Sequence, residues 1–441
     1  MDRPVVLGGA PLGQIEQPEW PHAAGGESKR LDDVLRSGRW AFDGPCEQAF
    51  EEAFSAQQTA RFGLCVANGT VAIQLALEAL DIGAGDEVVV PGFTWQATVA
   101  AVLDVNATPI LVDVEPATYC IDPRAVEAVI TDRTRAVIVV HLYDGIADMD
   151  RILQIAGRRG VSIIEDCAHS HGSRWNGRGV GSLGDLGTFS FQSSKSLTCG
   201  EGGFVTTNSE ALREAIYSLR NCGRRRPGSL DAQWRPIQSG NYRMTEWQSA
   251  VLLAQLESFP EQLAAREAAV RYLDHELSGI AGIRTTMRRP QVTMQGLYGY
   301  VIRFDEAAFD GLTGVAFREA LSAELGVAVG APYEPLNDSL LLRPHTKRRH
   351  RISEEYWTRI DPSRHALPVA ERAYRSEATI LPHELLLRPH AELGLVPAAI
   401  ERLREHLPAL ADWQKNIGAA VEGPRSTAAR PEGAIAPPGA A

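Results

Sequence analysis

The residues with the clearest chemical potential in this 441-residue chain are one lysine and one carboxylate. Lys195 lies between a strand-like run and a glycine-rich turn that ends at Gly203, and Asp166 ends a buried strand-like run that starts at Val161. A lysine can hold an aldehyde as a Schiff base, and a carboxylate can keep a pyridine nitrogen protonated. Pyridoxal phosphate (PLP) needs this pair of groups to act as an electron sink.

Two further segments could hold the phosphate and the ring of such a cofactor. Gly69 and Thr70 lie in a small-residue turn that leads into a predicted helix, where free N–H groups and the helix dipole favour an anion. Trp95 follows a predicted strand and could stack on a flat ring. Each residue also has an ordinary interpretation, because Asn68 and Thr70 suit a plain helix cap and a tryptophan often packs between sheet and helix.

The composition excludes several classes of protein. Lys and Arg number 44 against 55 Asp and Glu, so the net charge of −11 argues against nucleic acid or an anionic membrane surface as partner. No apolar run reaches the roughly 18 residues of a membrane span, and the first residues do not resemble a signal peptide. The six cysteines form no CxxC pair, so we predict no metal site and a reducing, cytoplasmic location.

Strands and helices alternate through the first half of the chain. The strand candidates are continuous apolar runs, which is typical of strands covered on both faces, and they predict an α/β fold with a mostly parallel central sheet flanked by helices. The predicted strands are Asp86–Val90, Thr108–Val112, Ala136–His141, Val161–Glu165, Gly187–Phe191 and Gly203–Thr207, and the predicted helices are Val71–Leu80, Ala97–Leu103, Pro123–Val129 and Met149–Arg159.

A second, smaller α+β unit is predicted toward the C-terminus. A helical stretch over Thr245–Leu273, broken at Pro260 because proline lacks an N–H, leads into it. We place the large domain at 1–260, the small C-terminal domain at 261–413 and a disordered tail at 414–441, which is poor in residues that can be buried from about Glu422 onward. The elements predicted for the small domain are strands at Tyr298–Phe304 and Ala378–Pro382, and helices at Val315–Leu325 and Pro397–Leu407.

Taken in order, these motifs resemble the DegT/DnrJ/EryC1/StrS aminotransferases. The resemblance rests on Asn68-Gly69-Thr70, Trp95, the run from Glu165 to His169, and the run from Ser190 to Gly203, and it extends from about Leu7 to Leu410. It implies a type I PLP-dependent transferase (aspartate aminotransferase-like) fold. It also implies an enzyme that aminates keto-sugars or keto-cyclitols.

The resemblance assigns a role to each residue that matches the motifs. Lys195 forms the Schiff base and then carries protons, and Asp166 pairs with the pyridinium nitrogen. Gly69, Thr70 and Ser190 hold the phosphate, Trp95 stacks on the ring, and His169 lies near the ring hydroxyl. Asn241 or Arg243 reaches across a homodimer interface to the partner's phosphate, so the two active sites are shared. Considered singly, these residues could be a solvated lysine, a helix cap or a surface ion pair, and His171 fits a core histidine.

Lys195 also indicates the reaction, since family members with histidine at this position act as dehydratases. The expected reaction moves an amino group from L-glutamine or L-glutamate to a ketone on a polyol ring. Segments around Tyr333, Lys347 and His350 resemble the cyclitol branch, the scyllo-inosose type, and these three residues are the candidates for substrate binding. Alternatives are a nucleotide-linked keto-sugar as substrate, a 3-amino-5-hydroxybenzoate synthase-like activity, and a non-catalytic binding role. The basic run Lys347–His350 could equally be a solvated loop.

Overall fold

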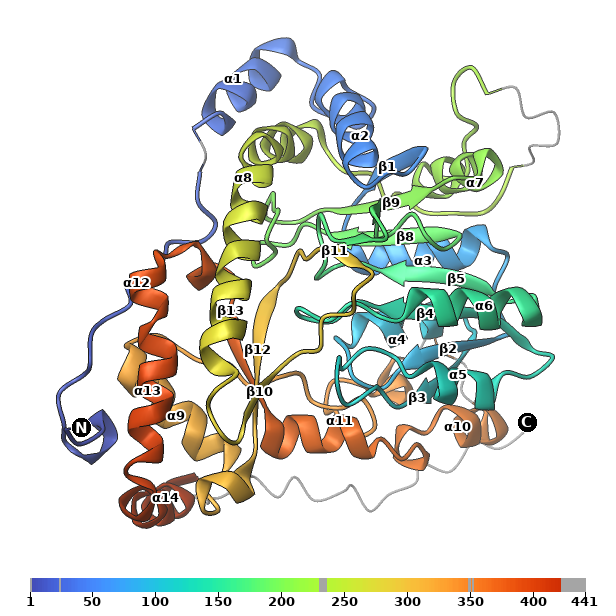
Figure 1. The fold of residues 1–441 in the computed structure, drawn as a ribbon. Helices are drawn as coiled ribbons and strands as arrows, with labels where there is room; N and C mark the ends of the chain where they lie inside the picture. Colours follow the sequence, from blue (N-terminus) through green and yellow to red (C-terminus); the bar gives the residue numbers. More distant parts are fainter. Residues whose placement is uncertain (1, 24, 230–235, 348–349, 351–352, 422–441) are drawn as a thin grey trace.

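The computed structural model describes the whole chain except residues 1, 24, 230–235, 348–349, 351–352 and 422–441 (Figure 1). Its main feature is a seven-stranded sheet of order β1-β9-β8-β5-β4-β2-β3. Neighbouring strands from β8 to β3 pair in parallel, whereas β9 is antiparallel to both β8 and β1. These strands are β1 (Phe62–Val66), β2 (Glu87–Pro91), β3 (Thr108–Val112), β4 (Thr134–Val140), β5 (Ser162–Asp166), β8 (Leu186–Ser190) and β9 (Gly203–Thr207).

Helices cover both faces of this sheet, which explains why its strands are continuously apolar. Alternate residues of β2 illustrate the division: Val88 and Val90 belong to the core on one face, and Val89 belongs to the core on the other. One face carries α3 (Gly69–Ala79), α4 (Ala97–Asp104) and α7 (Glu210–Arg220), and the other carries α2 (Pro45–Gln57), α5 (Pro123–Val129), α6 (Met149–Arg159) and part of α8 (Glu246–Leu277). The predicted α/β class and mostly parallel sheet are confirmed.

A second unit has its own antiparallel sheet of order β10-β12-β13 and its own hydrophobic core. Figure 1 shows it beside the large sheet, and the later part of α8 extends into its core. The elements are β10 (Ile283–Thr285), β12 (Gly299–Phe304), β13 (Ala378–Pro382), α9 (Gly314–Leu325), α12 (His390–Leu393), α13 (Leu395–Arg404) and α14 (Leu407–Val421). Ile15, from the N-terminal segment, is buried in this second core, while the proposed boundary at 260/261 stays a prediction.

One stretch leaves the second unit and returns to the large sheet. Leu336, Ile360 and Leu367 are buried in the core of the large sheet, and α10 (Glu354–Ile360) packs on β3. In the chain, α11 (Pro368–Arg372) follows Leu367 and precedes β13 of the second unit. The remaining elements are α1 (Glu27–Ser37), which packs on α8, and a small sheet of β6 (Arg174–Trp175), β7 (Arg178–Gly179) and β11 (Val292–Met294).

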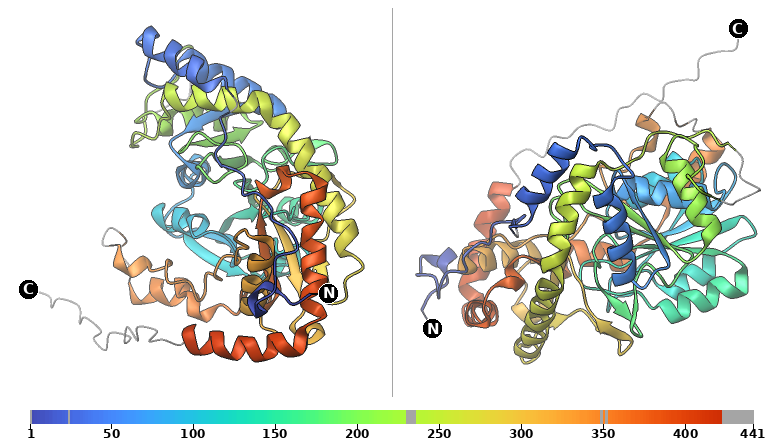
Figure 2. Two further views of the ribbon diagram at one scale, coloured as in Figure 1. Left: turned by 90° about the vertical axis from the view of Figure 1, so that its left-hand side faces the viewer. Right: turned by 90° about the horizontal axis from the view of Figure 1, so that it is seen from above.

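Most predicted elements are found within one or two residues of their expected bounds, but three expectations fail, and several elements, among them β1, α1, α2 and α7, were not predicted. Strand β1 was not predicted, because Cys65-Val66 was assigned to the turn that follows it. The predicted break at Pro260 is wrong: α8 is continuous, although it bends along its length (Figure 2). The lost hydrogen bond is tolerated there because Phe259 and Leu263 anchor the helix on the core.

The other two differences lie near the C-terminus. The helix predicted at Pro397–Leu407 ends at Arg404, and α14 starts at Leu407. Helix α14 continues to Val421, so residues 414–421 are helical instead of part of the predicted tail. Leu410, near the start of α14, is buried in the second core and attaches the helix to it. The rest of that tail, 422–441, lies outside the described residues.

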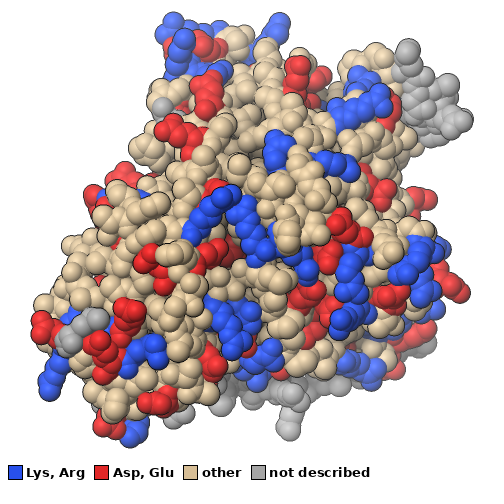
Figure 3. Space-filling view, in the orientation of Figure 1, with Lys and Arg blue, Asp and Glu red and all other residues tan. Residues whose placement is uncertain are grey.

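The surface shows no broad area of a single charge in the view of Figure 3, where basic and acidic side chains are interspersed. Among the described residues, no helix has the length and apolar character needed to cross a membrane.

Candidate active site

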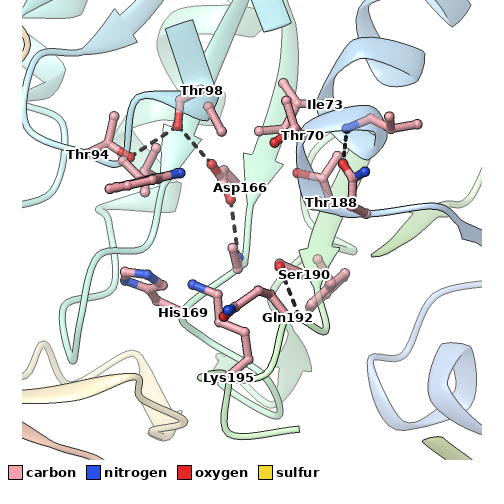
Figure 4. A pocket seen from close by; sticks show the side chains of 18 of the residues that line it. Thr70, Ile73, Thr94, Thr98, Asp166, His169, Thr188, Ser190, Gln192 and Lys195 are labelled. Atoms are coloured by element: carbon pink, nitrogen blue, oxygen red, sulfur yellow. Dashed lines mark hydrogen bonds between the residues drawn. The ribbon is translucent and has the colours of Figure 1, made fainter. Parts of the chain in front are cut away.

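A cavity of about 610 Å³ lies at the carboxyl ends of β5 and β8. Its walls come from the start of α3, the turn between β2 and α4, the ends of β5 and β8, and two tyrosines from the later part of the chain. Figure 4 shows Asp166, His169, Ser190 and Lys195 gathered around this space. Ligands of open parallel sheets bind at this edge, because the strand ends present loops and helix N-termini there.

Lys195 extends into the cavity from the loop after β8. Its loop is fixed from two sides: the Trp20 indole N–H donates to the Lys195 carbonyl at 3.2 Å, and His383 Nε2 lies 2.9 Å from the Ser194 carbonyl. Burial lowers the pKa of Lys195 to about 8, and the nearby Asp166 charge opposes part of this shift. A much larger fraction of this amine is therefore neutral near pH 7 than of an ordinary lysine.

Asp166 ends β5 and is held by two donors. The Thr98 hydroxyl donates to Oδ2 at 3.0 Å, and the Ala168 N–H donates to Oδ1 at 3.2 Å. Thr94 Oγ1 lies 3.1 Å from Thr98 Oγ1, and because Thr98 donates to Asp166, Thr94 is the donor of that contact. Burial raises the pKa of Asp166, whereas these donors and Lys195 lower it.

Sequence reasoning missed Thr94 and Thr98. Thr94 lies in the turn before α4, Thr98 lies in the first turn of that helix, and both side chains are buried. Two hydroxyl side chains with this spacing at the end of a strand could have indicated a buried polar partner.

Gly69, Thr70 and Ser190 lie together at the cavity wall, as the sequence predicted. Asn68 caps α3 by accepting the Val71 N–H at 2.9 Å, which leaves the first amides of the helix for an anion. A Cβ atom at Gly69 would lie 2.7 Å from Ser190 Cβ, so only glycine allows this close approach of helix and strand. The cradle fits a phosphate group.

Trp95 and His169 both line the cavity, with Tyr333 between them. The Trp95 side chain is 47% exposed, which is unusual for tryptophan and leaves a flat face open to the cavity. His169 Nδ1 accepts the Tyr143 N–H at 3.2 Å, so the proton lies on Nε2, which donates to the Tyr333 hydroxyl at 3.2 Å. Burial holds the pKa of His169 well below its usual range, and the imidazole is neutral.

Tyr298 is a cavity residue that the sequence analysis did not select. It immediately precedes β12, and its ring lies 4.1 Å from Lys195 Nζ and 4.1 Å from the His169 ring, measured to the ring centroid in each case. No short-range motif marks it, because its partners lie more than a hundred residues earlier in the chain.

Lys347 and His350 do not line the cavity; they contact its rim through Asp104. Lys347 Nζ lies 2.6 Å and His350 Nε2 lies 3.0 Å from the same oxygen, Asp104 Oδ1. Asp104 itself lines the cavity at the end of α4. The substrate candidates Lys347 and His350 therefore act on the cavity through Asp104 in this structure.

Asn241 and Arg243 lie outside the cavity of their own subunit. The Asn241 side chain accepts the Arg243 N–H at 3.3 Å, and the Arg243 guanidinium donates to Asn221 at 2.9 Å and lies over the Phe42 ring. Neither residue is placed to serve the pocket of its own chain.

Two histidines and Glu165 near the site are structural. His171 is fully buried with Nε2 2.9 Å from the Ser190 carbonyl, in line with the core role expected of it. His141, Glu165 and Cys167 have the spacing of a metal site, yet the Glu165 carboxylate already accepts three backbone N–H groups and a bond from His141. These donors satisfy the carboxylate without a cation.

Comparison with known proteins identifies the family. The model of the DegT/DnrJ/EryC1/StrS aminotransferase family matches residues 22–369, so the chain belongs to this family. It is 41% identical to the L-glutamine:scyllo-inosose aminotransferase of Streptomyces griseus over 92% of this chain and 99% of that protein. It is 40% identical to the L-glutamine:2-deoxy-scyllo-inosose aminotransferase of Streptoalloteichus tenebrarius over 91% and 97%.

Solved structures agree with this assignment. The crystal structure of 3-amino-5-hydroxybenzoic acid synthase superposes with a TM-score of 0.74 at 31% identity, covering 88% of this chain and all of that one. The protein is a PLP-dependent aminotransferase, and the type I transferase fold predicted from the sequence is confirmed.

Proposed function

We propose that this aminotransferase moves the amino group of L-glutamine to a keto-cyclitol of the scyllo-inosose type, in the biosynthesis of an amino-cyclitol natural product. The names of the two relatives above support both the donor and the acceptor. The observation that carries the proposal is the charge of the cavity lining.

Lys195 is the only lysine or arginine among the described residues that line the cavity, against three carboxylates, Asp104, Asp166 and Glu201. Lys347, which could have offered a second positive charge at the rim, is paired with Asp104. A nucleotide diphosphate requires cationic partners, whereas the hydroxyl groups of a neutral polyol ring can donate to carboxylates. The lining thus favours a neutral cyclitol over a nucleotide-linked sugar.

The residues present fit PLP, and we propose the roles that the sequence suggested for them. PLP, when bound, supplies an aldehyde that takes up the amino group and a ring that accepts electrons. Gly69, Thr70 and Ser190 would hold its phosphate, and Trp95 would cover its ring. Asp166, fixed by Thr98, would hold a proton on the ring nitrogen, since a positive partner lowers the pKa of a buried carboxyl group.

Lys195 would provide the proton transfers. Its amine has a pKa of about 8, so it can accept a proton as the neutral form and return it as ammonium near neutral pH. The neutral His169 would keep its Nε2–H bond to the Tyr333 hydroxyl without adding a positive charge beside the lysine.

One experiment separates the candidate substrates. The enzyme is loaded with pyridoxamine phosphate, freed of donor, and mixed in turn with scyllo-inosose, 2-deoxy-scyllo-inosose and a dTDP-4-keto-hexose. We expect single-turnover amination of one or both inososes and little reaction with the nucleotide sugar. Faster amination of the nucleotide sugar than of both inososes would contradict the proposal. L-glutamine and L-glutamate are compared as donors in the other half-reaction, which converts the PLP form of the enzyme to the pyridoxamine phosphate form.

We also propose a homodimer in which Asn241 or Arg243 completes the partner's phosphate site. The support is that both residues lie outside the cavity of their own chain, while a two-fold interface would make any such exchange reciprocal.

The test combines Lys195→Ala subunits with Asn241→Ala/Arg243→Ala subunits. The heterodimer should recover about half of wild-type activity, because one of its two pockets is then intact. No recovery in a heterodimer shown to form would mean that the segment serves its own chain.

A further inference from the structure

The amine of Lys195 faces an aromatic ring instead of a carboxylate. Its Nζ atom lies 4.1 Å from the centroid of the Tyr298 ring. Within the described part of the chain, this nitrogen makes no hydrogen bond and no ion pair, so the ring face is the favourable contact that the structure gives it. The lysine is half-buried, and a cation–π contact gains strength as water is excluded from it.

The Tyr298 ring is held firmly in this position. Its hydroxyl lies 3.0 Å from Ser194 Oγ, its backbone N–H donates to the Tyr143 carbonyl at 3.1 Å, and its ring stacks on His169 at an interplanar angle of 22°. Tyr298 stands just before β12, so the second unit supplies this ring to a lysine carried by the large sheet. A fixed ring loses little conformational entropy when it receives the amine.

We propose that the face of Tyr298 is the docking site of the Lys195 ammonium during the catalytic cycle, and that it sets the balance between the charged and the neutral amine. A lysine that carries a proton to and from the substrate would pass between the neutral amine and the ammonium in each turnover. The electron-rich face stabilises that ammonium without the permanent negative charge that would hold it there.

Several titratable groups surround the lysine, and they set the background against which Tyr298 acts. Asp166 favours the ammonium, while burial disfavours it. His169, His171 and His383 contribute no positive charge near neutral pH, because burial holds the pKa of each imidazole well below its usual range. Burial raises the pKa of the Tyr333 phenol well above its usual range, so this group is neutral near pH 7 as well. Removing the Tyr298 ring leaves all of these charged and titratable groups in place.

The test measures the Lys195 amine in the cofactor-free protein. Trace labelling with acetic anhydride at a series of pH values, followed by peptide mapping, gives the pKa of Lys195 itself. Wild type and Tyr298→Phe should agree, because both keep the ring face. Tyr298→Leu keeps an apolar side chain but lacks the face, so the pKa should fall by roughly 0.5 to 1.5 pH units, the range of a buried cation–π contact.

A second series guards against a folding defect in the leucine variant. Phenylalanine, 4-fluorophenylalanine and 3,4,5-trifluorophenylalanine placed at position 298 have similar size, but successive fluorine atoms weaken the negative face. The pKa of Lys195 should fall stepwise along this series. An unchanged pKa along the series, or a Tyr298→Phe variant that shifts as much as Tyr298→Leu, would overturn the proposal. Since the measurement uses no substrate, its outcome is independent of which ketone the enzyme aminates.

Discussion

The cavity has two halves that differ in how the chain builds them. The cofactor half is made by Gly69, Thr70, Asp166, Ser190 and Lys195, which lie at strand ends and a helix start of one parallel sheet. The rest of the lining and rim includes Tyr298 and Tyr333 from the later part of the chain, and Asp104 with its partners Lys347 and His350.

The two halves differ in whether local sequence motifs or long-range contacts position their residues. The cofactor half follows from local motifs, because a parallel sheet always brings its carboxyl ends to one edge. The other half needs two crossings of the chain, one that brings Tyr298 to Lys195 and one that returns Leu336, Ile360 and Leu367 to the core of the large sheet. We therefore expect mutations in the cofactor half to remove catalysis and mutations in the other half to tune it.

The largest effect is expected for Lys195→Ala, which should abolish turnover. The fold should survive, because the substitution removes a half-buried amine that makes no hydrogen bond among the described residues. Borohydride reduction of the wild-type holoenzyme followed by peptide mapping should label Lys195. Lys415→Ala, at an exposed ion pair with Asp412, is the control and should retain full activity. Labelling at any other lysine would contradict the assignment.

Asp166→Asn should keep the cofactor but lose activity by about 10²- to 10³-fold, the equivalent of about 3–4 kcal/mol at a buried charge pair. A neutral amide cannot hold the ring nitrogen protonated. Cofactor content by absorbance and kcat of the same preparation provide the measurement. Wild-type turnover in this variant would show that another group partners the nitrogen.

Thr98→Val should reduce kcat by about tenfold, because a hydrogen bond to a charged group contributes about 1.5–3 kcal/mol and water can replace part of it. Thr98→Ser keeps the hydroxyl that donates to Asp166 and should retain most of the activity. The comparison of the two variants isolates the hydrogen bond from the packing of the methyl group. Equal activities of the valine and serine variants would argue that Asp166 needs no help from Thr98.

Asp104→Asn should have a smaller effect, confined to the half-reaction with the ketone. It keeps an oxygen for Lys347 and His350 but removes the charge, and a partly exposed ion pair contributes about 0.2–1 kcal/mol. The KM for the ketone should rise about two- to fivefold, with the rate of the glutamine half-reaction unchanged. A larger loss in the glutamine half-reaction than in the ketone half-reaction would place Asp104 on the donor side.

The effect of pH on stability should be small near neutral pH and grow in acid. Burial lowers the pKa of His171 and of His383 to about 3, below the value of about 6.5 in an unfolded chain. Below pH 6.5 the unfolded chain binds protons that the folded chain does not, so stability present above this pH is lost as the pH falls toward 3.

The loss approaches about 1.4 kcal/mol per pH unit for each histidine. Urea unfolding between pH 7.5 and 5 measures it. Asparagine at position 383 can still donate to the Ser194 carbonyl, and the His383→Asn variant should show a pH slope reduced by about one proton. An unchanged slope would mean that His383 is protonated in the folded protein.

The sequence predicted most of the large sheet and the cofactor half of the site, for reasons that particular residues make clear. Thr108–Val112 and Gly203–Thr207 are found with the predicted bounds, because short apolar runs between turns have few other structures open to them. Strand β1 was missed because its last residues were assigned to the turn before Gly69. The helix break predicted at Pro260 was wrong because the local penalty for proline takes no account of the buried residues that hold α8 on the core.

By itself the sequence determined the α/β class and the family, and it selected the lysine and the carboxylate proposed to serve PLP, since these depend on residue types at fixed short spacings beside predictable strands. Only the tertiary structure decided that Thr98 supports Asp166, that Tyr298 receives the lysine amine, and that Lys347 and His350 meet at Asp104. Each of these contacts joins segments between 68 and 246 residues apart. Contacts of this kind are fixed by the packing of whole elements, which no local pattern of residues encodes.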